Sequence, residues 1–319
     1  MMKTYLENLI FQLQINPKFN APYYKIKRQF LGKGIPTQGL LASNLRRRGP
    51  YLNNVACGVY AKCQGRPWSI KGKISKKFKG LTIYMGFDVS RKQYGRAKHA
   101  SPGCIVVYDE NGQYIYHFTE NVPISYEYMD EDVSQNLIET TVARVKAKKG
   151  VEPNNIVFMR DGDINDSEIL GFKKGIREKG INLFILEIRK AGNIPILKKI
   201  SEEYTLADSG TYISIENNDE LRKLDIFIQT LGPEMNLPTI PKAVKVSPRF
   251  LAGKEISINN AELMEDLARQ ILILSHLNWS GLRGRTKLPI TIHFAHEAAL
   301  LMESGITPQN IDSMALWML

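Results

Sequence analysis

The chain has 319 residues, 43% of them apolar and 24% charged, which is an ordinary globular composition and enough for about two domains. It contains no apolar run of the roughly 18 residues that a membrane-spanning helix needs, and its start, MMKTYLENLIFQLQI, lacks the small-residue cleavage site of a signal peptide. We therefore expect a cytoplasmic protein with no membrane partner.

Charge is distributed unevenly along the chain. The net charge is +11, yet residues 1–79 hold sixteen Lys or Arg against a single acidic residue, Glu7, for +15, whereas residues 80–319 carry −4. Four aromatic residues are interleaved with the basic ones: Tyr23, Tyr24, Tyr51 and Trp68. This pattern favours a polyanion, most simply nucleic acid, over a merely solvated lysine-rich surface.

The cysteines argue for a reducing compartment. Cys57, Cys63 and Cys104 are odd in number and have no C-x-x-C spacing, so neither a disulfide framework nor a zinc knuckle is indicated. We interpret all three as small, buried or half-buried thiols.

The first predicted elements after residue 80 are a strand, a hairpin and a helix. Leu81–Val89 is an apolar run typical of a central strand. Residues 103–120, GCIVVYDENGQYIYHFTE, form two β-rich runs around Asn-Gly and predict a hairpin. Apolar residues at helical spacing predict a helix over Asp132–Lys149, with Gly150 as its stop.

The later elements continue the alternation of strands and helices. They are strands at Ile156–Met159 and Ile181–Ile188, and helices at Ser167–Lys179, Ala261–Leu277 and His293–Glu303. Residues 229–248 are Pro-rich and are interpreted as a connection between strands. Hairpin, helix, strand, helix, strand predicts an α/β fold with a mixed sheet.

Two aspartates stand at predicted strand ends. Asp88 ends one strand in YMGFDVS, and Asp161 ends another in VFMRDG. Neighbouring strand ends bring distant residues together, and two carboxylates placed there become useful when divalent cations lie between them. Because Asp is also a common turn former, this pattern alone leaves a metal site and an acidic turn both open. Asp163 and Asp166 are interpreted as turn and helix-cap residues, and Arg160 as support for the site or for a backbone phosphate.

Wider context adds a family resemblance. The segments GFDVS, FMRDG and NWSGLRGRTKLPITIHFAHEAA occur in this order and resemble the PIWI domain of Argonaute proteins. The resemblance implies an RNase H-like fold that slices a strand paired to a guide, with a tetrad of Asp, Glu, Asp and a fourth Asp, His or Asn. Matched by motif, Asp88 and Asp161 are the aspartates and His296, in HFAH, is the fourth member, with Phe294 in place of the usual Tyr. His293 is the runner-up.

The tetrad glutamate is harder to assign. The family places it on a mobile loop just ahead of a helix, and Glu127, in SYEYMDEDVS, matches best, with Glu120 and Glu131 as competitors. The resemblance implies that Asp88, Asp161 and His296 bind two Mg²⁺ or Mn²⁺ ions and that Glu127 closes the site. The structural alternatives are a solvated loop glutamate and a histidine that opens a helix.

The basic segment resembles the later part of an Argonaute MID domain, which is Rossmann-like and holds the guide's 5′ end. The resemblance lies in YYKIKRQFLGKGIPTQGLLASNL and NNVACGVYAKCQGRPWSI. The family's phosphate-binding residues fall on Tyr23, Lys27, Gln38 and Lys62, and the C-terminal carboxylate, here Leu319, often lies near them, sometimes through a bound cation.

The spacing of these residues suits a terminal phosphate. Tyr23 and Lys27 are four residues apart, one helical turn, so both would face the same ligand. A phosphate requires several charge-assisted donors, and an aromatic ring can stack on the first base. Tyr24 and Arg28 have the same spacing and are the alternative register.

We therefore expect a partial MID segment over residues 1–79 and a PIWI nuclease domain over residues 80–319. The expected function is cleavage of a DNA or RNA target paired to a 5′-phosphorylated guide, leaving a 3′ hydroxyl and a 5′ phosphate, in defence against foreign DNA. One alternative is a guide- and target-binding module that acts through a partner, and another is an unguided RNase H-like nuclease or integrase. A full MID domain would begin earlier, so the resemblance leaves open whether the sequence is part of a longer protein or the C-terminal half of a split one. In the split case, a second chain is expected to carry the N, PAZ and early MID parts.

Overall fold

The computed structural model describes residues 21–40, 44, 49–89, 101–122, 128–177, 179–189, 194–216, 224–235, 237–252, 261–282 and 284–306. Two predicted site residues, Glu127 and Leu319, lie outside these ranges. Within them, no helix is both long and apolar enough to cross a bilayer.

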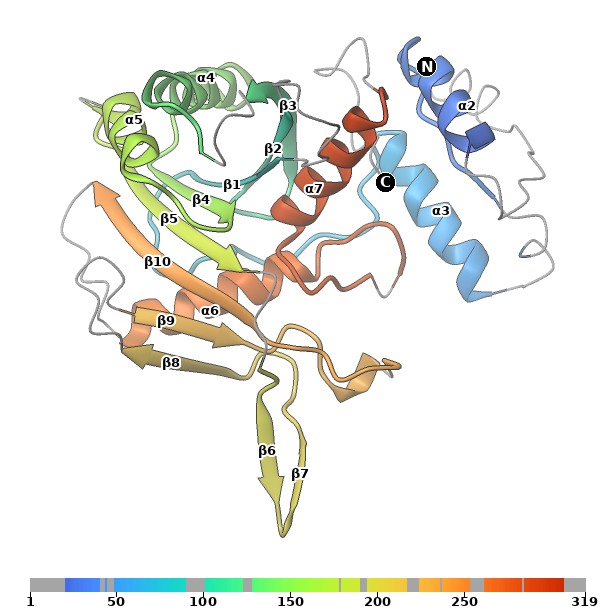
Figure 1. Ribbon diagram of the computed structural model, residues 1–319, viewed down its shortest axis with the longest axis vertical. Coiled ribbons are helices and arrows are strands. Elements are labelled where there is room, and N and C mark those ends of the chain that lie inside the picture. The colour runs from blue at the N-terminus through green and yellow to red at the C-terminus, as the bar shows by residue number, and fades with distance from the viewer. Residues whose placement is uncertain are drawn as a thin grey trace, which may run out of the picture.

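Eight of the described strands form one mixed sheet in the order β3-β2-β1-β4-β5-β10-β9-β8 (Figure 1). Strands β1, β4 and β5 are parallel neighbours, and the other neighbouring pairs are antiparallel. The predicted α/β class with a mixed sheet is confirmed. The strands are β1 (Thr82–Val89), β2 (Ser101–Asp109), β3 (Tyr114–Val122), β4 (Asn155–Asp161), β5 (Asn182–Arg189), β8 (Tyr212–Glu216), β9 (Leu224–Ile228) and β10 (Val244–Ala252).

Helices cover both faces of this sheet (Figure 1). Helices α4 (Glu131–Lys149) and α5 (Asp166–Ile176) lie on one face, and α6 (Ala261–Ser275) and α7 (Ile290–Glu303) lie on the other. The alternation of side chains along β1 follows this division, because Met85 and Phe87 belong to the α4–α5 core and Tyr84 to the α6–α7 core.

Two further helices stand beside α7, on the side away from the sheet (Figure 1). They are α2 (Ala21–Leu31) and α3 (Pro50–Lys62). Leu31 of α2 and Ala61 of α3 are fully buried in the same core as α6 and α7. Helices α2 and α3 are therefore packed against the part of the chain that carries the sheet.

Local sequence patterns predicted most of these helices and strands correctly. The predicted hairpin is β2 and β3, and α4 ends before Gly150, whose φ of 78° is left-handed. Helix α5 ends at Ile176, earlier than the predicted Lys179. Helix α7 begins at Ile290, earlier than the predicted His293, because Pro289 is well tolerated at the start of a helix.

One interpretation was wrong in part. Residues 229–248 are predicted to form a connection between strands, yet β10 begins at Val244 and runs through Pro248 between β5 and β9. A proline cannot donate to a sheet ladder. It is accommodated here because pairing with β9 extends only to Val246, so Pro248 has a partner only on the β5 side, at Leu186.

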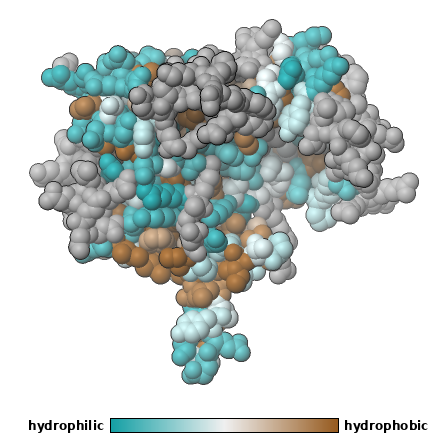
Figure 2. Space-filling view, in the orientation of Figure 1, coloured by the Kyte–Doolittle hydropathy of each residue, from teal (hydrophilic) through white to brown (hydrophobic). Residues whose placement is uncertain are grey.

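The sequence did not predict the strands between β5 and β10. Strands β6 (Leu197–Ile200) and β7 (Glu203–Leu206) form a separate hairpin that projects from the body (Figure 1). Their side chains are exposed or half-buried on both faces, so no alternation of apolar and polar residues marks them. Figure 2 shows hydrophobic residues gathered where this hairpin leaves the body and hydrophilic ones at its tip.

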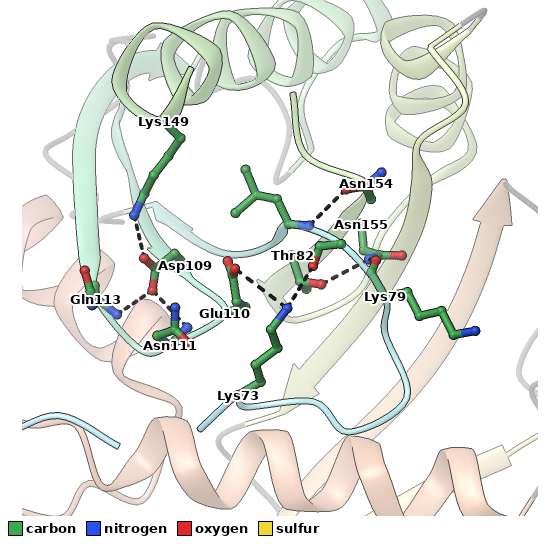
Figure 3. Close-up of polar contacts among 12 residues, drawn as sticks. Lys73, Lys79, Thr82, Asp109, Glu110, Asn111, Gln113, Lys149, Asn154 and Asn155 are labelled. Atoms are coloured by element: carbon green, nitrogen blue, oxygen red, sulfur yellow. Dashed lines mark hydrogen bonds and ion pairs between the residues drawn. The ribbon is translucent and has the colours of Figure 1, made fainter. Parts of the chain in front are cut away.

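A polar network closes the end of the sheet opposite Asp88 and Asp161 (Figure 3). The buried Asp109 accepts hydrogen bonds from the backbone N–H groups of Asn111 (2.9 Å) and Gln113 (2.8 Å), and its other oxygen pairs with Lys149 at 2.6 Å. These contacts fix the β2–β3 turn and satisfy a buried charge, so they account for this acid structurally.

Candidate functional site

Asp88 and Asp161 lie at one edge of the sheet. Strands β1 and β4 are parallel, with Phe87 opposite Arg160, so the next residue of each strand, Asp88 and Asp161, follows at the same edge. Asp88 is 7% exposed and Asp161 is half-buried. Asp88 Oδ1 accepts the N–H of Val89 at 2.9 Å, which fixes the carboxylate.

His296 joins this edge from the other end of the chain. Its Nδ1 lies 2.7 Å from Asp88 Oδ2. Helix α7 approaches β1 so closely that a Cβ at Gly86 would overlap the backbone of Thr291. Because Gly86 and Asp88 point to the same face of the sheet, this close packing brings the next turn of α7 to the Asp88 carboxylate.

The runner-up histidine lies differently. The ring of His293 is beside Phe294, with centroids 5.7 Å apart, whereas the ring of His296 is the one in contact with Asp88. The carboxylate therefore orients one specific imidazole, as second partners commonly do for metal-binding histidines. We call Asp88, Asp161 and His296 the strand-end cluster.

A buried ion pair supports the end of β4. Arg160 is 3% exposed, stacks over the Phe87 ring at 4.7 Å and pairs with Glu168 at 3.6 Å. Glu168 also accepts backbone N–H groups from Asn165 (3.1 Å) and Met129 (3.2 Å). Burial raises the pKa of Glu168, and the Arg160 charge opposes that shift. This arrangement favours the supporting role for Arg160 over a phosphate contact.

The acids after Asp161 have structural roles. Asp163 pairs with Arg189, and Gly162 makes the turn with a φ of 92°. The cap of α5 is Asn165, not Asp166 as predicted: its side chain accepts the N–H of Glu168 at 2.8 Å, which completes a capping box. Asp166 is instead the first residue of the helix, where a negative charge interacts favourably with the helix dipole.

The donor types of the strand-end cluster suit Mg²⁺ or Mn²⁺, which take carboxylate oxygens and, for Mn²⁺, imidazole. Among the described residues, however, no three His, Cys, Asp or Glu side chains converge closely enough to hold one metal ion. Glu131, a competitor for the tetrad glutamate, is the first residue of α4 and pairs with Lys174. For Glu120, only its backbone place on β3, opposite Gly103, is described.

Four predicted phosphate-binding residues come together beside α7. Lys27 Nζ donates to the Tyr23 hydroxyl at 3.1 Å, and Lys62 Nζ donates to Gln38 Oε1 at 2.6 Å and to the Thr37 carbonyl at 2.9 Å. Lys27 is 1% exposed and Lys62 is 4% exposed. We call Tyr23, Lys27, Gln38 and Lys62 the N-terminal cluster.

Burial changes the proton affinity of this cluster. Desolvation lowers the pKa of Lys62 to about 7, with a further contribution from the charge of Lys27. Desolvation also lowers the pKa of Lys27 to about 8, opposed by Glu297. Two buried ammonium groups that repel one another form a site that an anion would stabilise.

The residues of the alternative register, Tyr24 and Arg28, do not join the N-terminal cluster. Arg28 donates to the Ser304 carbonyl at the end of α7, and Tyr24 packs against the α6–α7 core. The sequence did not single out Glu297 or the Thr37 carbonyl as members of this region. The only sequence signal for Glu297 was its position beside His296. The residues of α2 whose pKa values its charge raises, Tyr23 and Lys27, are distant in sequence.

The chain is similar to proteins of one known family. The Piwi domain family model matches residues 9–307. Protein argonaute of Giardia intestinalis is 26% identical over 307 residues, which is 86% of this chain and 33% of that protein. Protein argonaute of Methanocaldococcus jannaschii is 26% identical over 285 residues, covering 87% of this chain and 35% of that protein.

Solved structures show the same fold. Clostridium butyricum Argonaute, solved with a guide DNA and a 19-mer target DNA, superposes with a TM-score of 0.73 at 22% identity over 93% of this chain and 37% of that one. The Argonaute of Methanocaldococcus jannaschii superposes with a TM-score of 0.63 at 20% identity. The chain thus spans about a third of the length of these relatives.

Proposed function

The chain belongs to the Piwi domain family and has distant relatives among Argonaute proteins, and from that premise we propose that it cleaves a target strand paired to a 5′-phosphorylated guide. The contact between Asp88 and His296, with Asp161 at the neighbouring strand end, carries this proposal. It joins residues that are 208 positions apart at the sheet edge where catalytic groups of open α/β sheets gather.

The three residues of the strand-end cluster share one proposed role. Asp88, Asp161 and His296 would hold Mg²⁺ or Mn²⁺, and Asp88 also orients the His296 ring through Nδ1. Two such ions, when bound, supply an activated water and stabilise the leaving oxygen of a phosphodiester. Arg160 and Glu168 hold the end of β4 in place from the buried side. Glu127 remains the proposed glutamate of the tetrad.

The guide's 5′ phosphate is proposed to bind at the N-terminal cluster. Lys27 and Lys62 would donate charge-assisted hydrogen bonds, Gln38 would donate through its amide, and the Tyr23 ring would lie under the first base. Leu319 is proposed to add its carboxylate, with or without a cation. Residues 1–79 are thereby assigned to guide binding and residues 80–319 to cleavage.

A cleavage assay tests the proposal. The chain, purified together with any partner it retains, is incubated with a 5′-phosphorylated guide, a matching target and Mn²⁺. We expect guided cutting by the wild type and a loss of at least about a hundredfold for Asp161→Ala. Asp163→Ala is the matched control, since it removes a nearby carboxylate that pairs with Arg189, and should cut as the wild type does. Equal loss in both variants would contradict the division of the acids.

The second candidate function is a module that binds guide and target and acts through another chain. It rests on the N-terminal cluster, whose buried lysines would hold a guide whether or not the strand-end cluster cuts. Binding of both strands with no cut in Mn²⁺ would select this reading. Cutting without any guide would instead select an unguided nuclease.

A further inference from the structure

The eight-stranded sheet ends at β8, whose outer side no described strand covers (Figure 1). Its inner side pairs with β9 in one unbroken antiparallel register. Edge strands of soluble proteins are commonly protected by lysine, proline or a bulge, because their free N–H and C=O groups can pair with another chain. The sequence of β8, YISIE, contains neither lysine nor proline, and its pairing shows no bulge. Strand β8 is therefore an unprotected edge.

The pairing with β9 shows which backbone groups of β8 face outward. The Thr211 carbonyl accepts the N–H of Gln229 at 2.9 Å, so the backbone of Thr211 faces β9. Backbone groups of successive residues in a strand point to opposite sides, so every second residue after Thr211 faces β9 as well. The residues whose N–H and C=O groups point away from the sheet are then Tyr212, Ser214 and Glu216.

Two isoleucines of β8 form an apolar stripe on one face of this edge. Ile213 is 47% exposed and Ile215 is 46% exposed, and side chains two residues apart in a strand share a face. Ile213 lies opposite Phe227 of β9, which is half-buried and packs against the apolar cluster at the base of the β6–β7 hairpin. Asp225, opposite Ile215, is paired with Lys245 at 2.6 Å, so its charge is neutralised beside the stripe. In Figure 2, hydrophobic residues gather at this margin of the body.

The order of residues in β8 is complementary to itself. When a second copy of β8 pairs antiparallel with the first about Ser214, Ser214 lies opposite its own copy, Ile213 opposite Ile215, and Tyr212 opposite Glu216. The backbone groups that point outward then meet in hydrogen-bonded pairs. The isoleucine pairs join into one apolar stripe across both copies, and each Glu216 meets a tyrosine rather than a like charge.

We propose that β8 is a dimerisation edge, at which two copies of this chain pair antiparallel about Ser214 and join their eight-stranded sheets. A two-fold contact uses the same surface on both copies, which a strand complementary to itself provides. A nucleic-acid strand fits this edge poorly, because β8 carries no Lys or Arg. Dimerisation at β8 does not depend on the cleavage proposed above, since neither cluster includes a residue of β8. Each dimer would carry one strand-end cluster in each half of a continuous sheet.

The molecular mass in solution tests this assignment, measured by light scattering on the nuclease-treated chain so that no nucleic acid bridges two copies. At micromolar concentration we expect the wild type to have twice the 36.2 kDa mass of one chain, and Ser214→Pro to have the mass of one. Proline removes an N–H that points outward, so pairing between copies is lost while the bonds between β8 and β9 remain. Ser214→Ala keeps that N–H and should remain dimeric.

A second variant tests the apolar stripe and keeps the test open if Ser214→Pro fails to fold. Ile215→Lys places a charge opposite Ile213 of the second copy and should also give a monomer. Leu170→Lys is the matched control, because Leu170 is 50% exposed on α5, away from β8, and this variant should remain dimeric. Only variants whose far-UV circular dichroism and thermal unfolding match those of the wild type are compared.

Disulfide trapping tests the register. The two Cα atoms of an antiparallel hydrogen-bonded pair are about 5.5 Å apart, which lies within the span of about 4.4–6.8 Å that a disulfide bridges. Ser214→Cys should therefore cross-link two copies under mild oxidation. Glu216→Cys is the control, because its two copies are offset along the strands by roughly 14 Å and should not cross-link. The wild type, with its three native cysteines, gives the background.

Three outcomes would overturn the assignment. A wild type that stays monomeric would leave the edge to a strand from a different polypeptide. A dimer that survives both Ser214→Pro and Ile215→Lys would mean that the copies meet at another surface. Cross-linking through Glu216→Cys but not through Ser214→Cys would contradict the antiparallel register about Ser214.

Discussion

At the scale of single residues, Lys62 is a group whose charge changes near neutral pH, because burial and the charge of Lys27 lower its pKa to about 7. An ammonium group binds a phosphate and a neutral amine does not, so affinity for a 5′-phosphorylated strand should fall as pH rises from 7 to 9. Lys27, with a pKa of about 8, adds to the fall. We expect roughly a tenfold loss per pH unit for each lysine once it is neutral in the unbound protein.

The measurement is a titration of binding against pH with phosphorylated and hydroxyl strands side by side. The phosphate's own second ionisation, near pH 6, is complete in this window and does not contribute. Lys62→Arg keeps a charge at all these pH values and should flatten part of the curve. A phosphorylated strand that binds equally at pH 7 and pH 9 would contradict the assignment of Lys62.

At the scale of elements, the packing of α7 on β1 determines whether His296 reaches Asp88. Gly86 leaves room for the backbone of Thr291, and a methyl group there would overlap it. We expect Gly86→Ala to lower the free energy of unfolding by about 2 kcal/mol or more and to move His296 away from Asp88. Guided cleavage should therefore fall even in the fraction of protein that remains folded.

Gly171→Ala is the matched control for this prediction. Gly171 of α5 meets the Glu131 carbonyl of α4 on the opposite face of the sheet, so its substitution should also destabilise the fold. It should nevertheless keep cleavage by the folded protein, because α7 is undisturbed. Thermal unfolding together with activity per folded molecule distinguishes the two variants. An equal loss of activity in both would contradict the prediction for Gly86→Ala.

At the scale of the whole molecule, the uneven charge predicts how nucleic-acid binding responds to salt. Residues 1–79 carry a net charge of +15 and residues 80–319 carry −4, which together give the net +11 of the chain. Affinity for a single strand should fall linearly with salt on logarithmic axes, with a slope of about −0.7 for each phosphate contacted. Lys62→Met should make that slope shallower by about 0.7, the contribution of one contacted phosphate. Lys199→Met, at the end of the β6–β7 hairpin, should leave it unchanged if binding is centred on the N-terminal cluster.

The sequence by itself determined the features that local patterns encode. Apolar runs and their stops located β1, β4 and α4, and the strand-end motifs singled out Asp88 and Asp161. The resemblance to an Argonaute MID domain selected Tyr23 and Lys27, which the structure brings together with Lys62. These features are readable because periodicity, turn residues and caps depend on neighbours a few positions away.

Only the tertiary structure decided which distant residues meet. It put His296 rather than His293 against Asp88, made Asn165 the cap of α5 and extended β10 through Pro248. Strands β6 to β8 were missed because side chains exposed on both faces leave no alternation. Such contacts arise from close packing between elements that are remote in sequence, here α7 on Gly86 of β1, and no local period records that packing.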